Sequence, residues 1–217
     1  MNRISYYILL FLCSFGCNAL FADCAQCYLR DKINPDNHRY GTFLAALNLI
    51  TERNVKTIVE TGTSRHGSRN CSGDGCSTVI FAQWATNHGA AVYSVDINPQ
   101  AIESARNALP IYYQESVNFI TGDSVNFLFN FEKTIDFLYL DSYDFEESKP
   151  MPSQLHHFRE IVAAYPWLTP DSIVMIDDCD LPHGGKGKLA IKYLLDHGWV
   201  VLKSGYQVIL VHKSSLQ

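Results

Sequence analysis

The chain has 217 residues, of which 47% are hydrophobic and 18% charged, a mixture typical of one globular domain and unlike that of a disordered protein. Its formal net charge is −5, and no basic run stands out among its 17 Lys and Arg residues. These values give no electrostatic reason to expect a nucleic acid as a partner, so we predict none.

The first 22 residues form a segment of their own. Arg3 precedes an apolar stretch, and small or polar residues, among them Ala19 and Ala22, follow it. This order is typical of a secretory signal peptide that is removed after one of these alanines. The alternative is an uncleaved membrane anchor over residues 4–22, which are barely long enough to span a bilayer. Both readings predict that the remaining chain lies outside the cytoplasm and meets a membrane only through this segment.

A polar lead-in follows, and then a first helix. Apolar residues at Phe43, Leu44, Leu47 and Ile50 have helical spacing and predict an amphipathic helix over residues 40–51. We therefore divide the chain into three parts: the signal peptide or anchor at 1–22, the lead-in with its helix at 23–54, and a single domain at 55–217.

From residue 55 onward, strand-like and helix-like runs alternate. The predicted strands lie at 56–60, 91–96, 117–121, 135–141 and 172–177, and the predicted helices at 77–87, 99–108, 124–131, 153–164 and 188–197. This alternation is typical of βαβ units that build a parallel sheet with helices on both faces.

The end of the chain breaks this alternation. Two strand-like runs, 199–203 and 206–212, are separated only by Ser204 and Gly205, a link that allows an antiparallel hairpin but no crossover helix. We therefore predict an α/β fold: a Rossmann-like, doubly wound, seven-stranded and mostly parallel sheet with an antiparallel C-terminal hairpin strand.

Each of the five predicted parallel strands ends at or shortly before an acidic residue. These acids are Glu60, Asp96, Asp123, Asp141 and the pair Asp177 and Asp178. Ligands of open parallel sheets bind outside the carboxyl ends of the strands. The row of acids therefore predicts an edge that binds hydroxyl groups or cations.

The loop after the first strand favours a nucleotide-like ligand. It starts with Glu60-Thr61-Gly62-Thr63 and carries further glycines, which allow close approach of a ligand, before a helix begins at Ser77. Asp96 can accept hydrogen bonds from a ribose diol. An NAD(P)-binding oxidoreductase is one reading, although the glycines do not fit the G-x-G-x-x-G spacing.

Together with the terminal hairpin, these motifs resemble the class I S-adenosylmethionine-dependent methyltransferases. The resemblance covers residues 55–213 and implies S-adenosylmethionine as the cofactor. It implies that Glu60, Thr61, Gly62 and Thr63 wrap the methionine end, with Ser77 at the following helix N-terminus, and that Asp96 holds the ribose. It places Gly122, Asp123 and Ser124 beside the adenine, where Asp123 could also cap a helix. The enlarged, Cys-containing loop at 64–76 departs from the family pattern.

The acids after the fourth and fifth strands look like the paired carboxylates of cation-dependent O-methyltransferases. The resemblance implies Mg²⁺ or another divalent cation on Asp141, Asp177 and Asp178, where it would lower the pKa of a substrate hydroxyl. The alternative is that these acids cap helices or form ordinary salt bridges.

A proton acceptor for the reaction could come from the loops that flank this acidic group. The candidates are Asp144, His183 and Lys186, which together with Asp141 are the predicted catalytic residues. His156 and His157 begin a predicted helix, and we expect them at the solvated surface rather than at a ligand.

The function predicted from these residues is methyl transfer from S-adenosylmethionine to a hydroxyl of a small molecule or sugar, assisted by a divalent cation. The alternatives are the oxidoreductase and a non-catalytic secreted binding module on the same scaffold, because the cofactor is made in the cytoplasm whereas the N-terminus predicts export. In an oxidising compartment, Cys24, Cys27, Cys71 and Cys76 could form disulfides within or between the two pairs, and zinc binding is a further alternative.

Overall fold

The computed structural model describes residues 24–216, so the predicted signal peptide or anchor lies outside the described residues. Seven strands form one sheet: β1 Thr57–Thr61, β2 Ala91–Asp96, β3 Val117–Thr121, β4 Ile135–Leu140, β5 Leu168–Ile176, β6 Trp199–Ser204 and β7 Val208–His212. The α-helices are α1 Ala25–Leu29, α2 Tyr40–Glu52, α3 Cys71–Asp74, α4 Ser77–His88, α5 Pro99–Asn107, α6 Ile111–Gln114, α7 Ser124–Phe129, α8 Pro150–Ala164 and α9 Lys188–Asp196.

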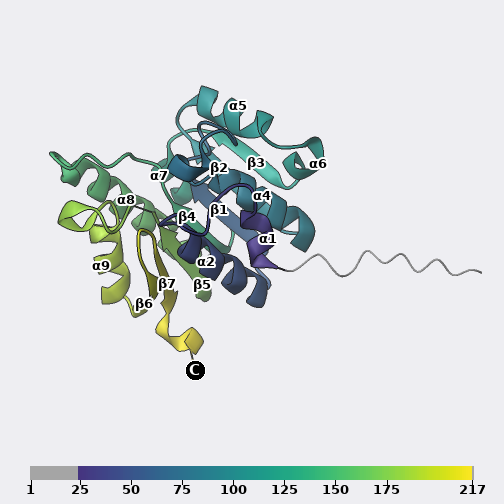
Figure 1. Cartoon of the computed structure of the whole chain (residues 1–217). Helices are drawn as coiled ribbons and strands as arrows, with labels where there is room; N and C mark the ends of the chain where they lie inside the picture. Colours follow the sequence, from purple (N-terminus) through teal and green to yellow (C-terminus); the bar gives the residue numbers. More distant parts are fainter. Residues whose placement is uncertain (1–23, 217) are drawn as a thin grey trace, which may run out of the picture.

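The strand order in the sheet is β3-β2-β1-β4-β5-β7-β6 (Figure 1). β7 is antiparallel to both of its neighbours, β5 and β6, and the pairs among β1 to β5 are all parallel. This arrangement confirms the predicted Rossmann-like, doubly wound sheet with its C-terminal hairpin.

The core has two parts, one on each face of the sheet. Along β4, Phe137 and Tyr139 belong to the part that α1, α2 and α4 cover, whereas Leu138 and Leu140 belong to the part that α7, α8 and α9 cover. This division follows from the alternation of side chains along a strand. Both faces of the central strands are buried, which explains why their sequences are almost continuously apolar.

The short elements α1, α3 and α6 were not predicted, because four or five residues are too few to show helical periodicity. β7 begins at Val208, two residues later than predicted, because Tyr206 and Gln207 leave the ladder and turn toward the acidic strand ends. β5 begins four residues earlier than predicted, at Leu168.

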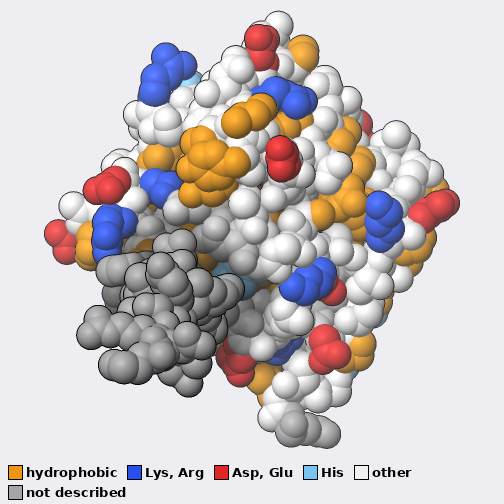
Figure 2. Space-filling model, turned by 90° about the vertical axis from the view of Figure 1, so that its right-hand side faces the viewer, with side chains coloured by type: hydrophobic (Ala, Val, Ile, Leu, Met, Phe, Trp, Pro, Cys, Tyr) orange, Lys and Arg blue, Asp and Glu red, His pale blue; other side chains and the backbone are white. Residues whose placement is uncertain are grey.

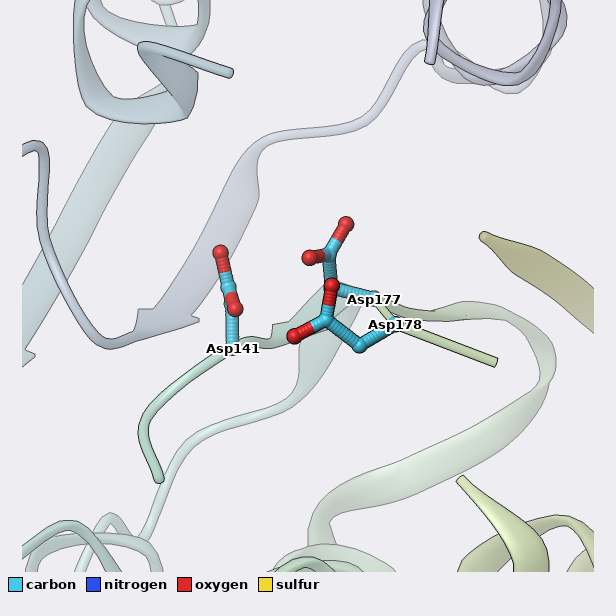
Figure 3. A group of neighbouring side chains, drawn as sticks. All are labelled: Asp141, Asp177 and Asp178. Carbon is cyan, nitrogen blue, oxygen red and sulfur yellow. The ribbon is translucent and has the colours of Figure 1, made fainter. Parts of the chain in front are cut away.

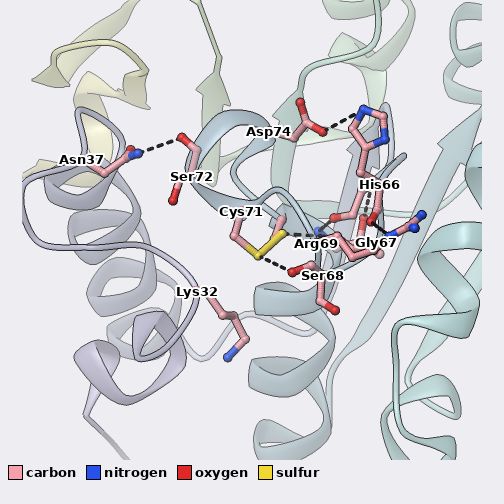
Figure 4. Close-up of a disulfide and its surroundings, with 12 residues drawn as sticks. Lys32, Asn37, His66, Gly67, Ser68, Arg69, Cys71, Ser72 and Asp74 are labelled. Carbon is pink, nitrogen blue, oxygen red and sulfur yellow. Dashed lines mark hydrogen bonds and ion pairs between the residues drawn. A yellow bond between two sulfur atoms is a disulfide. The ribbon is translucent and has the colours of Figure 1, made fainter.

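The enlarged loop after β1 contains a disulfide between Cys71 and Cys76, one of the predicted pairings (Figure 4). The lead-in lies against this loop: the Asn37 side-chain amide donates a hydrogen bond to the carbonyl of Ser72 (2.9 Å). Cys24 and Cys27 are free thiols. Of the alternatives left open by the sequence, only the pairing of Cys71 with Cys76 is present among the described residues.

The surface mixes charges of both signs. On the face shown in Figure 2, Lys and Arg side chains are interspersed with Asp and Glu side chains. Among the described residues, no helix is both long and apolar enough to cross a membrane.

Candidate active site

Two adjoining cavities lie at the carboxyl ends of the strands. One, of about 270 Å³, is lined from the ends of β2 and β3 and from α8, and includes Asp96, Asp123 and His156. The other, of about 200 Å³, lies over the ends of β4 and β5 and includes Asp141 and Lys186. Gly62, Asp96 and Ser142 line both. Several of the predicted cofactor residues and several of the predicted catalytic residues therefore lie at one edge of the sheet.

Gly62, the first residue after β1, lies directly against the backbone of Asp141, the first residue after β4. It has φ +79°, and a Cβ atom at this position would lie 2.3 Å from the carbonyl oxygen of Asp141. Its N–H donates to the carbonyl of Val95 (2.8 Å). Only glycine fits this conformation and this approach without strain, and Gly62 lines both cavities.

The carboxylate of Asp96 is held in place by backbone groups. One oxygen accepts from the N–H of Asn98 (2.8 Å) and the other from the N–H of Thr63 (3.3 Å). Asp123 caps α7 by accepting from the N–H of Asn126 (2.8 Å), and it lines the first cavity as well. The helix cap predicted for Asp123 is therefore confirmed, and its contact with the adenine stays a prediction. Asp96 and Asp123 therefore place carboxylate oxygens, which accept hydrogen bonds from hydroxyl groups, at the first cavity.

Three of the predicted cofactor contacts lie beneath the site instead. Glu60, Thr61 and Ser77 are buried and line neither cavity. Because side chains alternate along β1, Glu60 points toward α4, where it accepts from the hydroxyls of Thr78 (2.7 Å) and Ser94 (2.6 Å). Glu60 thus supports the loop after β1 from below and is not placed to contact the cofactor.

Burial raises the pKa of Glu60 to about 7, although hydrogen bonds from Ser77, Ser94 and Thr78 lower it. Because the folded state retains this proton to a higher pH than the unfolded state, the resulting stabilisation is full below about pH 4.5 and is lost as the pH rises through about 7.

We expect this loss to disappear in a Glu60→Gln variant. Between about pH 5 and about pH 8, the wild-type protein without cofactor should lose up to about 3 kcal/mol of unfolding free energy relative to the variant. Urea unfolding at the two pH values measures the difference, with the exposed residue change Glu103→Gln as a control. If the free energy of unfolding depended on pH equally in the wild type and in Glu60→Gln, the raised pKa of Glu60 would be contradicted.

The acidic group of Asp141, Asp177 and Asp178 lies at the ends of β4 and β5 (Figure 3). One carboxylate oxygen of each residue lies within 4.8 Å of the others. Asp178 has a left-handed backbone with φ +39°, which turns its side chain back toward Asp141. The predicted convergence of these three acids is confirmed.

Two buried cations neutralise most of this charge. Arg39 donates to both oxygens of Asp177, from Nε (3.3 Å) and from Nη2 (3.2 Å). Lys186 Nζ lies 2.5 Å from an oxygen of Asp141 and 3.1 Å from an oxygen of Asp178. Burial would raise the pKa of Asp177, but Lys186 and Arg39 outweigh it and hold that pKa below its usual value.

The three carboxylates do not fit a divalent cation in this arrangement. An ion that contacts Asp141 and Asp178 at the usual 2.0 to 2.6 Å, roughly, would need the space that the Lys186 ammonium occupies. The alternative reading of these acids, as partners in salt bridges, describes the geometry as it stands.

Aromatic and amide side chains complete the acidic group. Tyr206, from the turn of the C-terminal hairpin, donates to Asp178, and the guanidinium carbon of Arg39 lies 4.4 Å from the centre of the Tyr206 ring. Gln207 donates to Asp177 (2.7 Å) and to the hydroxyl of Tyr139 (2.9 Å). The hairpin therefore positions the site as well as closing the sheet.

The predicted proton acceptors differ in their fit. Asp144 lines the second cavity and pairs with Arg65 (2.8 Å), a bond that lowers its pKa. His183 is exposed and lines neither cavity, so it is not placed for catalysis. Burial would lower the pKa of Lys186, but Asp141, Asp177 and Asp178 raise it above the usual value, which makes Lys186 a fixed cation and not a base.

The expectation for the two histidines is wrong. His157 is fully buried, and His156 lines the first cavity, where its Nε2 lies 3.1 Å from the Ser124 hydroxyl and 3.3 Å from the buried carboxylate of Glu160. Hydrogen bonding to Glu160 raises the pKa of His156. The charged residues that the sequence did not point to, Arg39 and Arg65, come from outside the strand ends.

Comparison with known proteins identifies the family. Residues 72–179, about half of the chain, match the family model Methyltransf_24, described as a methyltransferase domain. The chain belongs to the class I S-adenosylmethionine-dependent methyltransferases. As a methyltransferase it is an enzyme, and this assignment replaces the oxidoreductase and the non-catalytic scaffold. No curated protein matches the chain.

Solved structures share the methyltransferase fold. An O-methyltransferase from Bacillus cereus in complex with SAH has a TM-score of 0.55 at 15% identity, with 86% of each chain covered. A TDP-rhamnose 3'-O-methyltransferase of calicheamicin biosynthesis has a TM-score of 0.57 at 18% identity, with 80% of each chain covered. The cofactor-bound protein Rv0187 from MTB has a TM-score of 0.57 at 12% identity, with 87% of this chain and 85% of that chain covered.

Proposed function

We propose that this methyltransferase acts on a hydroxyl group of a small polar acceptor, with a sugar as the favoured class. The observation that carries the proposal is the second cavity, which adjoins the cofactor cavity at Gly62 and Asp96. Its charged and phenolic lining consists of Arg39, Arg65, Asp74, Asp96, Asp141, Asp144, Asp177, Asp178, Lys186 and Tyr206.

This lining suits a polyhydroxyl acceptor better than a flat aromatic one. Carboxylates accept hydrogen bonds from hydroxyl groups, and Arg and Lys side chains donate to sugar oxygens. Tyr206 supplies the aromatic ring among the described lining residues, and its face already carries Arg39. The structural likeness to a TDP-rhamnose methyltransferase agrees with a sugar acceptor but does not identify one.

The residues divide into a cofactor half and an acceptor half. Gly62, Thr63, Asp96, Asp123 and Ser124 would hold S-adenosylmethionine, which supplies an electrophilic methyl group when bound. Asp141 lines the acceptor half and lies against Gly62, which lines both cavities. It would accept the proton of the acceptor hydroxyl as the acceptor oxygen bonds to the methyl carbon, the methyl–sulfur bond breaks and S-adenosylhomocysteine is released. Catalysis would rest mainly on holding the two reactants in line, with proton removal as an addition.

The divalent cation predicted from the sequence does not enter the proposed reaction. In the arrangement described above, the carboxylates of Asp141 and Asp178 share the Lys186 ammonium and Asp177 pairs with Arg39. The proposed reaction therefore contains no step that needs a metal.

The function can be tested with S-adenosylmethionine carrying a labelled methyl group and a panel of free sugars, nucleotide sugars, catechols and amines. We expect label on a sugar hydroxyl, and an Asp141→Asn variant should turn over at least about 100-fold more slowly with unchanged cofactor affinity. Asp180→Asn is the matched control, since Asp180 is exposed and lines neither cavity. Label confined to amines or catechols, or equal loss of cofactor binding in Asp141→Asn, would contradict the proposal.

We also propose that the enzyme acts outside the cytoplasm, either released after signal cleavage or anchored by residues 4–22. The order of residues at the N-terminus supports export, and the disulfide between Cys71 and Cys76 suits an oxidising compartment. Cell fractionation together with N-terminal sequencing of the mature protein tests this location. Recovery in the cytoplasm with an intact N-terminus would contradict it.

A further inference from the structure

Lys186 is brought into the acidic group by the backbone around it. The side chain is 1% exposed, and its own N–H donates to the carbonyl of Asp178 (3.1 Å). Gly185, at φ +56°, passes so close to Asp178 that a Cβ atom would lie 1.8 Å from the same carbonyl oxygen. The segment that carries Lys186 is therefore packed directly onto the end of β5, and glycine is required for that approach.

The Lys186 ammonium stands between carboxylates from two different strand ends. It contacts Asp141 after β4 and Asp178 after β5, the two residues that a bridging cation would also have to contact. An ammonium has three N–H donors, and within the described residues these two contacts use two of them. The third is available to an acceptor oxygen that enters the second cavity.

The net charge of the acidic group also argues against a bound divalent ion. Three carboxylates face two buried cations, Arg39 and Lys186, which leaves one formal negative charge. A divalent ion added to this set would make the group positive and would lie against the ammonium. Like charges at such short range in a buried site repel strongly.

We propose that Lys186 takes the place of a divalent cation in this methyltransferase, so that it positions the acceptor oxygen and makes methyl transfer independent of metal. This inference rests on the proposed transfer to a hydroxyl group. In the reaction, the acceptor oxygen accepts a hydrogen bond from Lys186 while its proton passes to Asp141. The oxygen forms a bond to the methyl carbon as the methyl–sulfur bond breaks, S-adenosylhomocysteine leaves, and Lys186 keeps its own protons throughout. Lys186 thus stabilises the reacting oxygen electrostatically, as a metal would.

The direct test is a titration of the full chain with Mn²⁺, followed by electron paramagnetic resonance, in the absence of any substrate. The wild type should show no Mn²⁺ bound at the acidic group at micromolar concentrations. A Lys186→Met variant should gain one site that binds Mn²⁺ at least about 10-fold more tightly than the wild type does, because its carboxylates lose the Lys186 ammonium. Adding Asp141→Asn to that variant should remove the site again.

Lys188→Met serves as the matched control, because Lys188 is exposed two residues away and should leave Mn²⁺ binding unchanged. One Mn²⁺ bound tightly by the wild type and lost in Asp141→Asn would overturn the inference, and this result needs no Lys186 variant to fold. In a second arm, wild-type turnover should be equal in EDTA and in millimolar Mg²⁺. A transferase that fails on every hydroxyl acceptor would contradict the proposed function, whereas the Mn²⁺ titration would still decide the role of Lys186.

Discussion

Replacing Arg39 with methionine should lower the free energy of unfolding by about 3–5 kcal/mol. The exchange removes the partner of a fully buried carboxylate, and a buried charge left without its partner is strongly destabilising. Arg39 also donates to the carbonyl of Gly73 (2.7 Å), so the disulfide loop loses a contact as well. Urea unfolding followed by circular dichroism measures the change.

Arg65→Met is the matched control for this prediction. Arg65 lines the same cavity but is half exposed, and its pair with Asp144 should contribute at most about 1 kcal/mol. Adding Asp177→Asn to Arg39→Met should recover part of the loss, because it removes the unpaired charge. A loss in Arg39→Met no larger than that in Arg65→Met would show that the buried pair does not hold the site together.

The second large effect is expected at Asp96. Replacement by alanine should weaken binding of S-adenosylmethionine at least about 100-fold, because the ribose would lose two hydrogen bonds to a charged acceptor. Calorimetric titration of the folded variant with the cofactor measures the affinity. Asp180→Ala, at the same edge of the sheet but outside both cavities, should bind as the wild type does.

This variant separates the two halves of the site. Asp96→Ala should lose cofactor affinity, whereas Asp141→Asn should keep it and lose turnover. Wild-type affinity in Asp96→Ala, with the variant folded, would remove the ribose role of Asp96 and with it the division of the site.

Much of the fold could be predicted because strands, turns and helix starts are marked by patterns of a few neighbouring residues. The apolar runs of β2 and β3 have the predicted bounds, and the link after Ser204 is too short for anything but a hairpin. The acids after β4 and β5 were predicted to converge because parallel strands bring their carboxyl ends to one edge. Asn98 and Pro99 likewise mark the start of α5, where Asn98 caps through its side chain.

The partners of those acids could not be predicted, because they come from distant parts of the sequence. Arg39 lies 138 residues from Asp177, in a lead-in whose polar composition gives no sign of burial. Tyr206 reaches Asp178 from a turn that the apolar pattern assigns to a strand. The glycines around Lys186 were visible, but only the close approach to Asp178 explains why the chain needs them.

Burial explains the remaining errors. The family resemblance implied that Glu60 contacts the cofactor, yet the alternation of side chains along β1 turns it under the loop. His156 and His157 were predicted at the surface because they lie near the start of a predicted helix, yet α8 buries His157 and places His156 beside Ser124 and beside Glu160, one turn further along α8. A polar residue in a helix gives little indication from sequence alone of which face it occupies.

The most direct test of the account is calorimetric titration of the folded wild-type protein with S-adenosylmethionine in the presence of EDTA. The account predicts binding of one cofactor per chain, without added metal and with unchanged affinity when Mg²⁺ is supplied. A folded protein that binds no cofactor, or that binds it only when Mg²⁺ is present, would contradict it.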